Sequence, residues 1–282
     1  MSSTGSTGRR VPVPTRPLAG DVEIPMVGLG VYQSTPGHTT RGAVLAALDA
    51  GYRHIDTAAV YRNEPDVGEA IRRSSIPREE VFVTTKLWNS NHGYDPALRA
   101  FDRSLNRLGF EYVDLYLVHW PVPEERLETW RAMERILADG RARAIGVSNY
   151  MLRHIDELMT NATVPPAVNQ FELSPYLARW GLVDRCRELG IAVETYSPLT
   201  KGRKLKDRVL IEMAMRYGKS PAQILIRWAL DHGFVVIPKS VHPRRIRENI
   251  DVFDFSLDAN DLASLDALDE GLVTGWNPTN AP

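Results

Sequence analysis

The stretch Tyr112-Val113-Asp114-Leu115-Tyr116-Leu117-Val118-His119-Trp120-Pro121 contains an apolar run of strand character that ends in a histidine. Two other short runs end in a similar way, because residues 52–55 lead into Asp56 and residues 81–85 lead into Lys86. Tyr61 follows Asp56 by a few residues. In a parallel α/β barrel, active sites are built at the rim formed by the C-terminal strand ends. A carboxylate, a phenol, an ammonium and an imidazole at that rim indicate proton-transfer chemistry.

Strand-like runs alternate with helical patterns along the whole chain. Strands are expected over 26–29, 54–56, 81–85, 113–118, 144–147, 167–171, 192–196 and 234–237. Helices are expected over 40–50, 64–74, 96–108, 124–139, 151–160, 181–189, 208–231 and 243–250. This alternation, in 282 residues, predicts right-handed parallel crossovers that close into one α/β domain, a (β/α)8 TIM barrel.

Several expected helices carry boundary signals. Asp95-Pro96 is typical of an N-cap followed by proline at the first helical position, and Gly109 is typical of the end of that helix. Gly140 and Gly190 are further stop signals, and Ser220-Pro221 begins a new helix inside 208–231.

An open, doubly wound sheet is the alternative architecture. It should carry a Gly-x-Gly-x-x-Gly turn between its first strand and first helix. The nearest stretch, Gly28-Leu29-Gly30-Val31-Tyr32-Gln33, lacks the third glycine and opens no helical pattern. The barrel is therefore favoured.

Composition narrows the classes of partner. The chain has 34 basic and 35 acidic residues, for a net charge of -1, so it has no general attraction to nucleic acid or anionic membrane. It contains no apolar run long enough to span a bilayer, and no His-Glu-x-x-His or cysteine pair that would indicate a metal site. We expect a monomer whose partner is a small molecule.

The two ends and the single cysteine give further expectations. Residues 1–20 are expected to be a flexible lead-in, and residues 21–282 to form the barrel with a C-terminal substrate loop. Residues 1–16 lack the apolar stretch of a secretory signal. Cys186 has no partner for an intramolecular disulfide, which is consistent with a reducing, cytoplasmic location.

Six motifs, in order along the chain, resemble those of the aldo-keto reductase family. They are Gly51-Tyr52-Arg53-His54-Ile55-Asp56-Thr57-Ala58 with Tyr61, Thr85-Lys86-Leu87-Trp88-Asn89, residues 112–121 quoted above, Ile145-Gly146-Val147-Ser148-Asn149, Tyr196-Ser197-Pro198-Leu199 and Ile237-Pro238-Lys239-Ser240. The resemblance runs from about Pro25 to Phe255 and is strongest to bacterial reductases of diketogluconate, methylglyoxal and other small dicarbonyls. It implies a (β/α)8 barrel that reduces aldehydes and ketones with a nicotinamide cofactor.

The resemblance implies that Tyr61 donates the proton to the carbonyl oxygen. A free phenol has a pKa near ~10, so a neighbouring Lys86 ammonium is expected to lower the pKa of Tyr61. Asp56 would keep Lys86 charged and in place, since a lone buried ammonium tends to lose its proton. His119 would offer an imidazole N–H that orients the carbonyl and stabilises developing charge.

The loop after the last strand is a candidate phosphate site. Barrels of this kind commonly bind phosphate after strands 7 and 8, and here Lys239-Ser240 is followed by Arg244, Arg245 and Arg247. The resemblance assigns Lys239, Ser240 and Arg245 to the adenosine 2′-phosphate and Glu248 and Asn249 to the adenine. This set favours NADPH over NADH.

The resemblance also assigns the remaining contacts to cofactor and substrate. Tyr196 would stack on the nicotinamide, and Ser148, Asn149 and Gln170 would bind its carboxamide. The ribose and pyrophosphate path would be lined by Gly30, Val31, Tyr32, Ser197 and Leu199. The substrate pocket would be aromatic, with Trp88, Trp120, Trp276 and Tyr32, and Asn89 and His92 are further candidates for contacts to substrate oxygens.

The chain departs from the family after Leu199. Many relatives have glycine and a small polar residue there, whereas this chain has Thr200-Lys201-Gly202, so Lys201 is an additional candidate for a phosphate contact. Trp130, Trp180 and Trp228 lie on helical patterns and are expected to pack in the core. The short C-terminal segment, residues 271–282, is typical of a promiscuous reductase of small substrates.

The sequence is also compatible with two alternative functions. One is a Schiff-base aldolase with Lys86 or Lys239 as the nucleophile. The other is a barrel that binds the cofactor for regulation and turns over little. The Gly146-Val147-Ser148-Asn149-Tyr150 stretch lacks the second glycine of a hydrolase nucleophile elbow.

Overall fold

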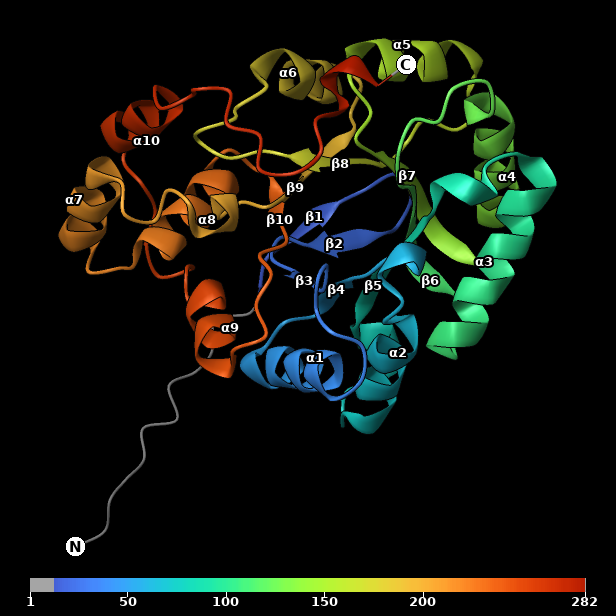
Figure 1. Cartoon of the computed structure of the whole chain (residues 1–282), viewed down its shortest axis with the longest axis horizontal. Helices are drawn as coiled ribbons and strands as arrows, with labels where there is room; N and C mark the ends of the chain where they lie inside the picture. Colours follow the sequence, from blue (N-terminus) through green and yellow to red (C-terminus); the bar gives the residue numbers. More distant parts are fainter. Residues whose placement is uncertain (1–12, 282) are drawn as a thin grey trace, which may run out of the picture.

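Eight parallel strands form a closed ring in the computed structural model, which describes residues 13–281 (Figure 1). The strands are β3 (Leu29–Gly30), β4 (His54–Asp56), β5 (Phe82–Leu87), β6 (Val113–Val118), β7 (Ala142–Ser148), β8 (Val168–Glu172), β9 (Ala192–Tyr196) and β10 (Val235–Val236). They pair in chain order from β3 to β10. The parallel bridges Val27–Val236 and Gly30–Lys239 join the two ends of the sheet. The predicted (β/α)8 barrel is confirmed.

Helices surround the ring of strands (Figure 1). The α-helices are α1 (His38–Ala50), α2 (Glu64–Arg73), α3 (Tyr94–Leu108), α4 (Arg126–Ala138), α5 (Leu152–Asn161), α6 (Trp180–Glu188), α7 (Arg208–Tyr217), α8 (Pro221–Asp231), α9 (Pro243–Ile250) and α10 (Ala259–Asp266). Single 3₁₀ turns cover η1 (Ala59–Tyr61), η2 (Arg78–Glu80), η3 (Asn89–Asn91), η4 (Thr200–Gly202) and η5 (Pro278–Asn280). Helix α10 was not among the expected elements.

The boundary signals act mostly where the sequence placed them. Gly109 ends α3 in a left-handed conformation, with φ of 68°. Ser220 caps α8 through reciprocal hydrogen bonds with Gln223, which separates α7 from α8. Helix α3 begins two residues earlier than expected. Gly93 is its N-cap, and Asp95 lies inside the first turn.

The expected lead-in of residues 1–20 was too long. Residues 1–12 lie outside the described residues, but β1 (Thr15–Pro17) pairs antiparallel with β2 (Glu23–Pro25). Leu18, Val22 and Ile24 of this hairpin pack with Leu115 and other residues near the N-terminal strand ends. The hairpin therefore closes the end of the barrel opposite to the rim that carries Asp56. The expected strand 26–29 is correspondingly divided between β2, an isolated bridge at Val27 and β3.

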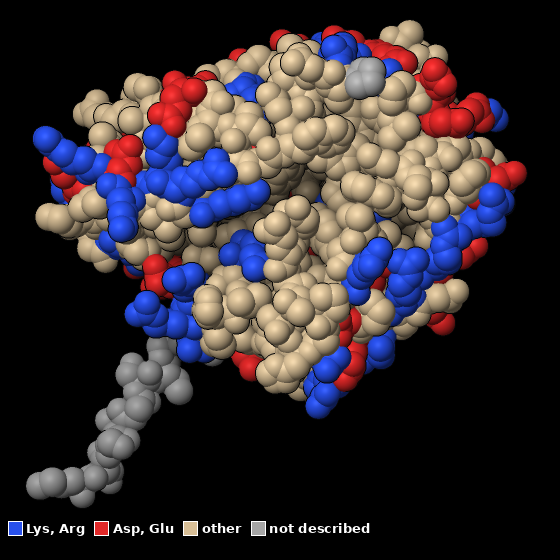
Figure 2. All heavy atoms as spheres, in the orientation of Figure 1, with Lys and Arg blue, Asp and Glu red and all other residues tan. Residues whose placement is uncertain are grey.

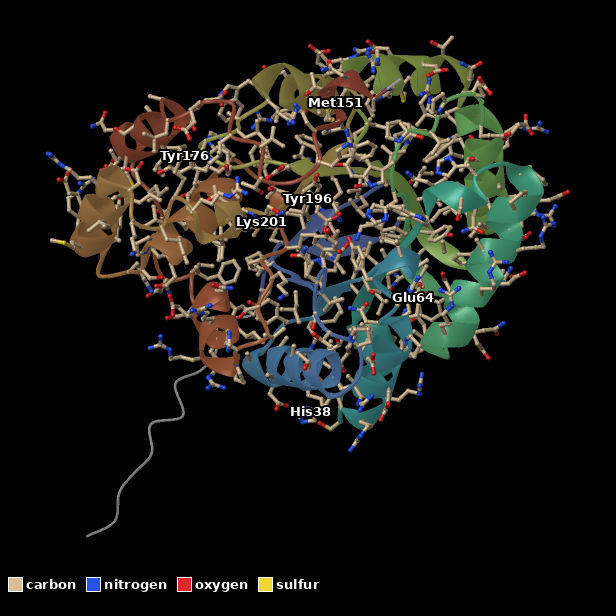
Figure 3. All side chains as sticks on the ribbon, in the orientation of Figure 1. His38, Glu64, Met151, Tyr176, Tyr196 and Lys201 are labelled. Atoms are coloured by element: carbon tan, nitrogen blue, oxygen red, sulfur yellow. The ribbon has the colours of Figure 1, made fainter. Side chains whose placement is uncertain are left out.

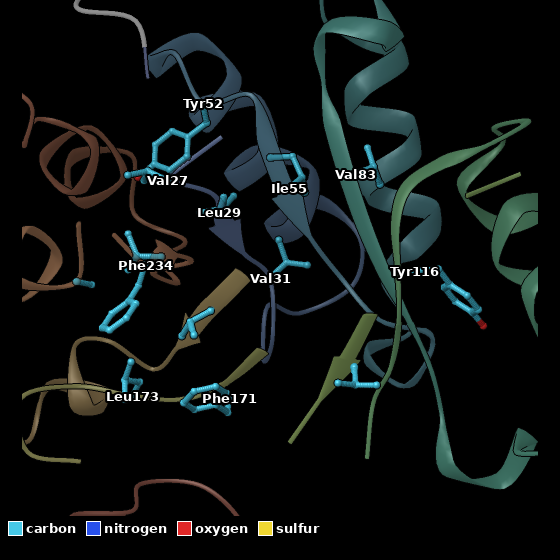
Figure 4. Close-up of a cluster of buried hydrophobic side chains, with 14 of the residues drawn as sticks. Val27, Leu29, Val31, Tyr52, Ile55, Val83, Tyr116, Phe171, Leu173 and Phe234 are labelled. Carbon is cyan, nitrogen blue, oxygen red and sulfur yellow. The ribbon is translucent and has the colours of Figure 1, made fainter. Parts of the chain in front are cut away.

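A continuous apolar core fills the space between the strands and the helices (Figure 4). Trp130 and Trp228 are buried, and Trp180 packs against Trp228 with ring centroids 6.1 Å apart, so the expected structural roles fit these three tryptophans. Within residues 13–281 no helix is both long and apolar enough to cross a bilayer. The same residues contain no group of histidine, cysteine or acidic side chains placed to hold a metal ion.

Candidate active site

A buried ion pair lies at the C-terminal rim of the barrel. Asp56 is the last residue of β4 and Lys86 lies near the end of β5. Lys86 Nζ donates to Asp56 Oδ1 at 2.6 Å, to Asp56 Oδ2 at 2.7 Å and to the carbonyl of Thr57 at 2.9 Å. The Lys86 side chain is fully buried. These bonds compensate the burial of the ion pair and fix the Lys86 side chain in place.

Tyr61 and His119 lie next to this pair. Tyr61 ends the 3₁₀ turn η1 that follows β4, and Lys86 Nζ lies 5.2 Å from the centre of its ring. The ring of His119, which directly follows β6, is 5.6 Å from the Tyr61 ring in an edge-to-face arrangement. The structure thus brings together Asp56, Tyr61, Lys86 and His119, the four residues that the sequence predicted at the rim.

The expected direction of the Tyr61 pKa was wrong in this structure. Burial of the phenol and the nearby Asp56 carboxylate raise the pKa of Tyr61 well above its ordinary value. Asp56 binds Lys86 with both oxygens, so the ammonium does not act as an isolated positive charge beside the phenol. Tyr61 is therefore a neutral hydroxyl at neutral pH and carries a proton that it can donate.

His119 is also neutral. Burial, followed by the charge of Lys86, lowers the pKa of His119 well below its ordinary value. Its Nδ1 is buried and has no hydrogen-bond partner among the described residues. A neutral imidazole is a suitable hydrogen-bond group for a carbonyl oxygen because it does not compete with Tyr61 as an acid.

Aromatic rings surround the open side of His119. Trp88 lies 5.3 Å from its ring and Trp120 6.4 Å, and Trp276 packs on Trp120 at 4.4 Å. Tyr32 contacts Tyr61 at 5.1 Å and is half exposed. The predicted aromatic residues thus lie together, with Trp276 contributed by the C-terminal segment. Figure 2 shows a hollow in the middle of this face.

The C-terminal segment is held over the rim by specific polar contacts. Glu172, the last residue of β8, accepts hydrogen bonds from the backbone N–H groups of Thr274 and Gly275 and from the Thr274 hydroxyl. Lys201 Nζ donates to the carbonyl of Thr274 at 2.8 Å. Lys201 therefore binds the C-terminal segment rather than standing free for a phosphate, and Glu172 is a residue that the sequence interpretation missed. Figure 3 shows Lys201 and Tyr196 near the middle of this face.

Ser148, Asn149 and Tyr196 form one hydrogen-bonded group. Asn149 Nδ2 donates to the carbonyl of His119 and to Ser148 Oγ, both at 3.0 Å. Tyr196 donates its hydroxyl proton to Asn149 Oδ1 at 2.8 Å. Asn149 has a φ of 64°, a left-handed conformation that asparagine tolerates better than most residues. These contacts fix the three side chains beside His119.

Gln170 reaches a second buried carboxylate that was not predicted. Its Nε2 donates to Asp56 Oδ2 and to Glu194 Oε2, both at 2.9 Å. Glu194 lies in β9 and is fully buried. The sequence signal was a single acidic residue inside the apolar run 192–196, two positions before Tyr196.

Three basic residues after β10 have no ion pair within residues 13–281. Lys239 and Ser240 follow β10, and Lys239, Arg244 and Arg245 have no ion pair with another residue in the described part of the chain. Ser240 Oγ accepts a hydrogen bond from the N–H of His242, next to the start of α9. Basic side chains gather on one side of the hollow in Figure 2, over α8 and the start of α9.

Arg247 lies in a groove away from the C-terminal rim of the barrel. It lines a groove together with Arg53 and Glu80, which precede strands β4 and β5 and so lie toward the opposite end of the barrel. It was expected in the anion site and is not brought there. Glu248 and the buried Asn249 follow it in α9, and nothing in the described residues tests their assignment to adenine.

Two of the loop residues assigned to the ribose and pyrophosphate path, Gly30 and Val31, have structural roles of their own. The Val31 side chain is buried, its N–H donates to the carbonyl of Asp56 and its carbonyl accepts from Asn63, so its polar groups are already engaged. Gly30 lies against β10, where a Cβ would be 3.0 Å from the carbonyl oxygen of Ile237. The glycine is therefore explained by closure of the barrel.

The segment after β9 is backbone-strained. Ser197, Thr200 and Lys201 have φ values of 52°, 50° and 51°, and Leu199 lies between them. Non-glycine residues in this region are uncommon and cluster at functional sites. The segment lies between Tyr196 and the C-terminal segment that Lys201 binds.

Asn89 and His92 have unused polar atoms. Asn89 Oδ1 and both ring nitrogens of His92 are buried without partners among the described residues. Burial and the charge of Arg126 lower the pKa of His92 to about 4, so the ring is neutral at neutral pH.

The residues present fit an anionic dinucleotide. Lys239, Arg244 and Arg245, which follow β10, have no ion pair within residues 13–281, and Ser148, Asn149, Gln170 and Tyr196 are fixed by hydrogen bonds beside Tyr61 and His119. A cofactor with phosphates at one end and a carboxamide at the other matches this division.

Comparison with known proteins supports the same conclusion. The aldo/keto reductase family model matches residues 27–270. An aldo-keto reductase of Mycolicibacterium smegmatis is 52% identical, over 90% of this chain and 93% of its own. Glyoxal reductase of Bacillus subtilis is 46% identical, over 93% and 95% of the two chains. The structure of a Bombyx mori aldo-keto reductase in complex with NADP has a TM-score of 0.87 and 40% identity, over 94% of this chain and 95% of that one. The chain belongs to the aldo/keto reductase family.

Proposed function

We propose that this protein is an NADPH-dependent reductase that converts small aldehydes, ketones and dicarbonyls to alcohols. The observation that carries the proposal is the contact of a neutral Tyr61 with His119 and with the buried Lys86–Asp56 pair, inside an aromatic pocket. Membership of a family that includes a glyoxal reductase and an NADP-bound reductase supports the same reaction.

The reaction requires a hydride at the carbonyl carbon and a proton at the oxygen. NADPH supplies the hydride when bound. Tyr61 donates its hydroxyl proton to the oxygen as the C=O double bond becomes a C–O single bond, and the product is the alcohol with NADP⁺. His119 hydrogen-bonds the same oxygen and orients it. Lys86 and Asp56 hold the Tyr61 side of the site in place, and the resulting phenolate regains a proton from water.

The cofactor would be held by residues on two sides of the hollow. Lys239, Ser240 and Arg245 would bind the 2′-phosphate. Ser148 and Gln170 would bind the carboxamide, with Asn149 holding Ser148 and Tyr196 in place and Tyr196 against the ring. Trp88, Trp120, Trp276 and Tyr32 would enclose the carbonyl substrate. Apolar walls with few polar groups favour broad specificity for small carbonyls.

The aldolase alternative is not supported by the site. All three N–H groups of Lys86 are used by Asp56 and Thr57, and a charged, bonded ammonium is a poor nucleophile. Kinetic measurements would distinguish a regulatory barrel from a reductase.

The site is made by one chain, which suits a monomer, and the single free thiol of Cys186 suits the reducing cytoplasm.

The direct test is NADPH oxidation, measured by absorbance with purified protein and a panel of small aldehydes, ketones and dicarbonyls. Turnover of glyoxal or methylglyoxal with NADPH, and much weaker turnover with NADH, is expected. NADPH binding without turnover of any substrate in the panel would favour the regulatory barrel instead.

Arg245→Ala is expected to weaken NADPH binding by about 10- to 100-fold, the value of a hydrogen bond to a charged group. NADH, which lacks the 2′-phosphate, should bind the variant and the wild type equally. Dissociation constants from tryptophan fluorescence titration measure both effects. Arg247→Ala is the matched control, because Arg247 lines a different groove. Equal weakening of NADH would mean that Arg245 does not read the 2′-phosphate.

The pH dependence of the two reaction directions should differ. Reduction needs the neutral Tyr61 hydroxyl, and the raised pKa of Tyr61 and lowered pKa of His119 predict a flat kcat between about pH 6 and 7. Alcohol oxidation needs the Tyr61 phenolate as base, so its rate should rise about tenfold per pH unit through the alkaline range. Steady-state rates in both directions test this, and an oxidation rate that levels off near pH 7 would contradict the raised pKa.

A further inference from the structure

Glu194 is a fully buried carboxylate that the proposed reaction does not use. It lies in β9, inside the barrel, and two other strands bring polar groups to it. Gln170 in β8 donates to its Oε2 at 2.9 Å, and the Nε2 of His54 in β4 lies 3.7 Å from its Oε1. Burying a carboxyl group is costly, so its retention beside the catalytic cluster requires an explanation.

The contact with Glu194 fixes the orientation of the Gln170 amide. The amide nitrogen has two N–H donors, and both are used, one by Asp56 Oδ2 and the other by Glu194 Oε2. If the amide were reversed, its oxygen would face the Asp56 carboxylate, and above about pH 8 the ionised Glu194 as well, and these hydrogen bonds would be lost. The two carboxylates therefore require the nitrogen at this position, and Gln170 Oε1 is the group left to accept a hydrogen bond.

The neighbouring side chains leave a complementary donor. Asn149 Nδ2 is engaged by the carbonyl of His119 and by Ser148 Oγ, and Asn149 Oδ1 accepts from Tyr196. Ser148 Oγ accepts from Asn149, so its own proton is available for donation. The group thus offers one acceptor, Gln170 Oε1, and one donor, the Ser148 hydroxyl. A primary carboxamide, with one N–H₂ and one C=O, matches this pair.

We propose that Glu194 is a positioning residue for the nicotinamide carboxamide, acting through Gln170. Glu194 and Asp56 together hold the Gln170 amide so that its oxygen selects a cofactor carrying an N–H₂ group. This inference rests on the proposed function and names one further residue of the same site. Glu194 itself contacts neither cofactor nor substrate in this arrangement.

The charges around Glu194 set how it responds to pH. Asp56, His54, Lys86 and Tyr61 are the titratable groups that face it. Burial and the Asp56 carboxylate raise the pKa of Glu194 to about 8, and burial lowers the pKa of His54 to about 3. Glu194 therefore gains its charge as the pH rises through about 8, and the ionised carboxylate is the stronger acceptor for Gln170.

The test compares NADP⁺ with its 3-acetylpyridine analogue, in which a methyl ketone replaces the carboxamide and no N–H₂ group remains. Dissociation constants are measured by tryptophan fluorescence for the wild type, Glu194→Met, Glu194→Gln and Gln170→Met. The wild type should prefer NADP⁺. Glu194→Met, which keeps the volume but removes the acceptor, should reduce that preference about tenfold by weakening NADP⁺ alone.

The other variants make the result specific. Glu194→Gln keeps an oxygen for Gln170, so it should retain the preference but lose any change in it near pH 8. Gln170→Met should lose the preference, and adding Glu194→Met to it should cause no further loss. Glu64→Gln removes charge from a different buried glutamate, which bonds Thr85 and Arg107, and should leave the preference unchanged. Circular dichroism establishes that each variant is folded.

An unchanged preference in folded Glu194→Met, or additive losses in the double variant, would overturn the role of Glu194. If Glu194→Met does not fold, a Glu194→Gln variant that binds both ligands equally would overturn it as well. Failure of the proposed function is a separate outcome, because it would appear as a wild type that binds neither NADP⁺ nor NADPH, or that binds NADPH and oxidises it with no carbonyl substrate.

Discussion

Tyr61→Phe is expected to lower kcat for carbonyl reduction by about 10²- to 10⁴-fold, the usual contribution of a positioned general acid. The change removes one hydroxyl and keeps the ring, so the contacts of Tyr61 with Tyr32 and His119 persist. NADPH affinity should stay unchanged because the cofactor is held by other residues. Steady-state kinetics with a small dicarbonyl, together with a fluorescence titration of NADPH, measure the two quantities separately.

Tyr116→Phe is the matched control for this experiment. Tyr116 lies in β6, is fully buried and has a hydroxyl without a hydrogen-bond partner among residues 13–281. Its removal should leave turnover intact. If Tyr61→Phe and Tyr116→Phe behave alike, Tyr61 is not the proton donor.

Lys86→Met should damage both folding and turnover. It removes the cation from a buried pair and leaves the Asp56 carboxylate without compensation, which costs about 3–5 kcal/mol of unfolding free energy. Turnover should also fall, because Lys86 lies beside the Tyr61 ring and fixes Asp56 below it. Urea denaturation and kcat are the two measurements.

The double variant Lys86→Met with Asp56→Asn separates these two effects. Removing the second charge should recover much of the lost unfolding free energy, since the penalty comes mainly from the unpaired carboxylate. Turnover should remain low. Recovery of kcat together with stability would mean that the pair serves the fold alone.

The barrel was predictable because its signals are local. Most βα units carry an apolar run of strand length, as in β6, and several helices carry boundary signals, as in α8 with its Ser220 capping box. The hairpin of β1 and β2 was missed because the residues that bury it, such as Leu115, are distant in sequence. Residues 13–25 contain prolines at positions 14, 17 and 25, and their burial against Leu115 follows only from the closed barrel.

The cluster of Asp56, Tyr61, Lys86 and His119 was predictable for a different reason. Parallel strands bring their C-terminal ends to one rim, so titratable residues at the ends of β4, β5 and β6 have to meet there. The direction of the Tyr61 pKa was not predictable, because it depends on how completely Asp56 engages Lys86 and how deeply the phenol is buried.

The buried polar network was missed for a related reason. A single acidic residue such as Glu194 within a strand does not indicate whether it faces the barrel interior or the helices. Only the register of β8 and β9, which pairs Gln170 with Glu194, places the two side chains together. Glu172 likewise acquires its role from Thr274, about a hundred residues later in the chain.

In the proposed reaction, Tyr61 donates a proton to a carbonyl that receives a hydride from NADPH. A single-turnover experiment tests it most directly: protein loaded with NADPH is mixed with excess glyoxal and absorbance at 340 nm is followed. We predict one equivalent of NADPH oxidised rapidly by the wild type and far more slowly by Tyr61→Phe. A wild type that binds NADPH but oxidises none, or a Tyr61→Phe variant as fast as the wild type, would contradict the account.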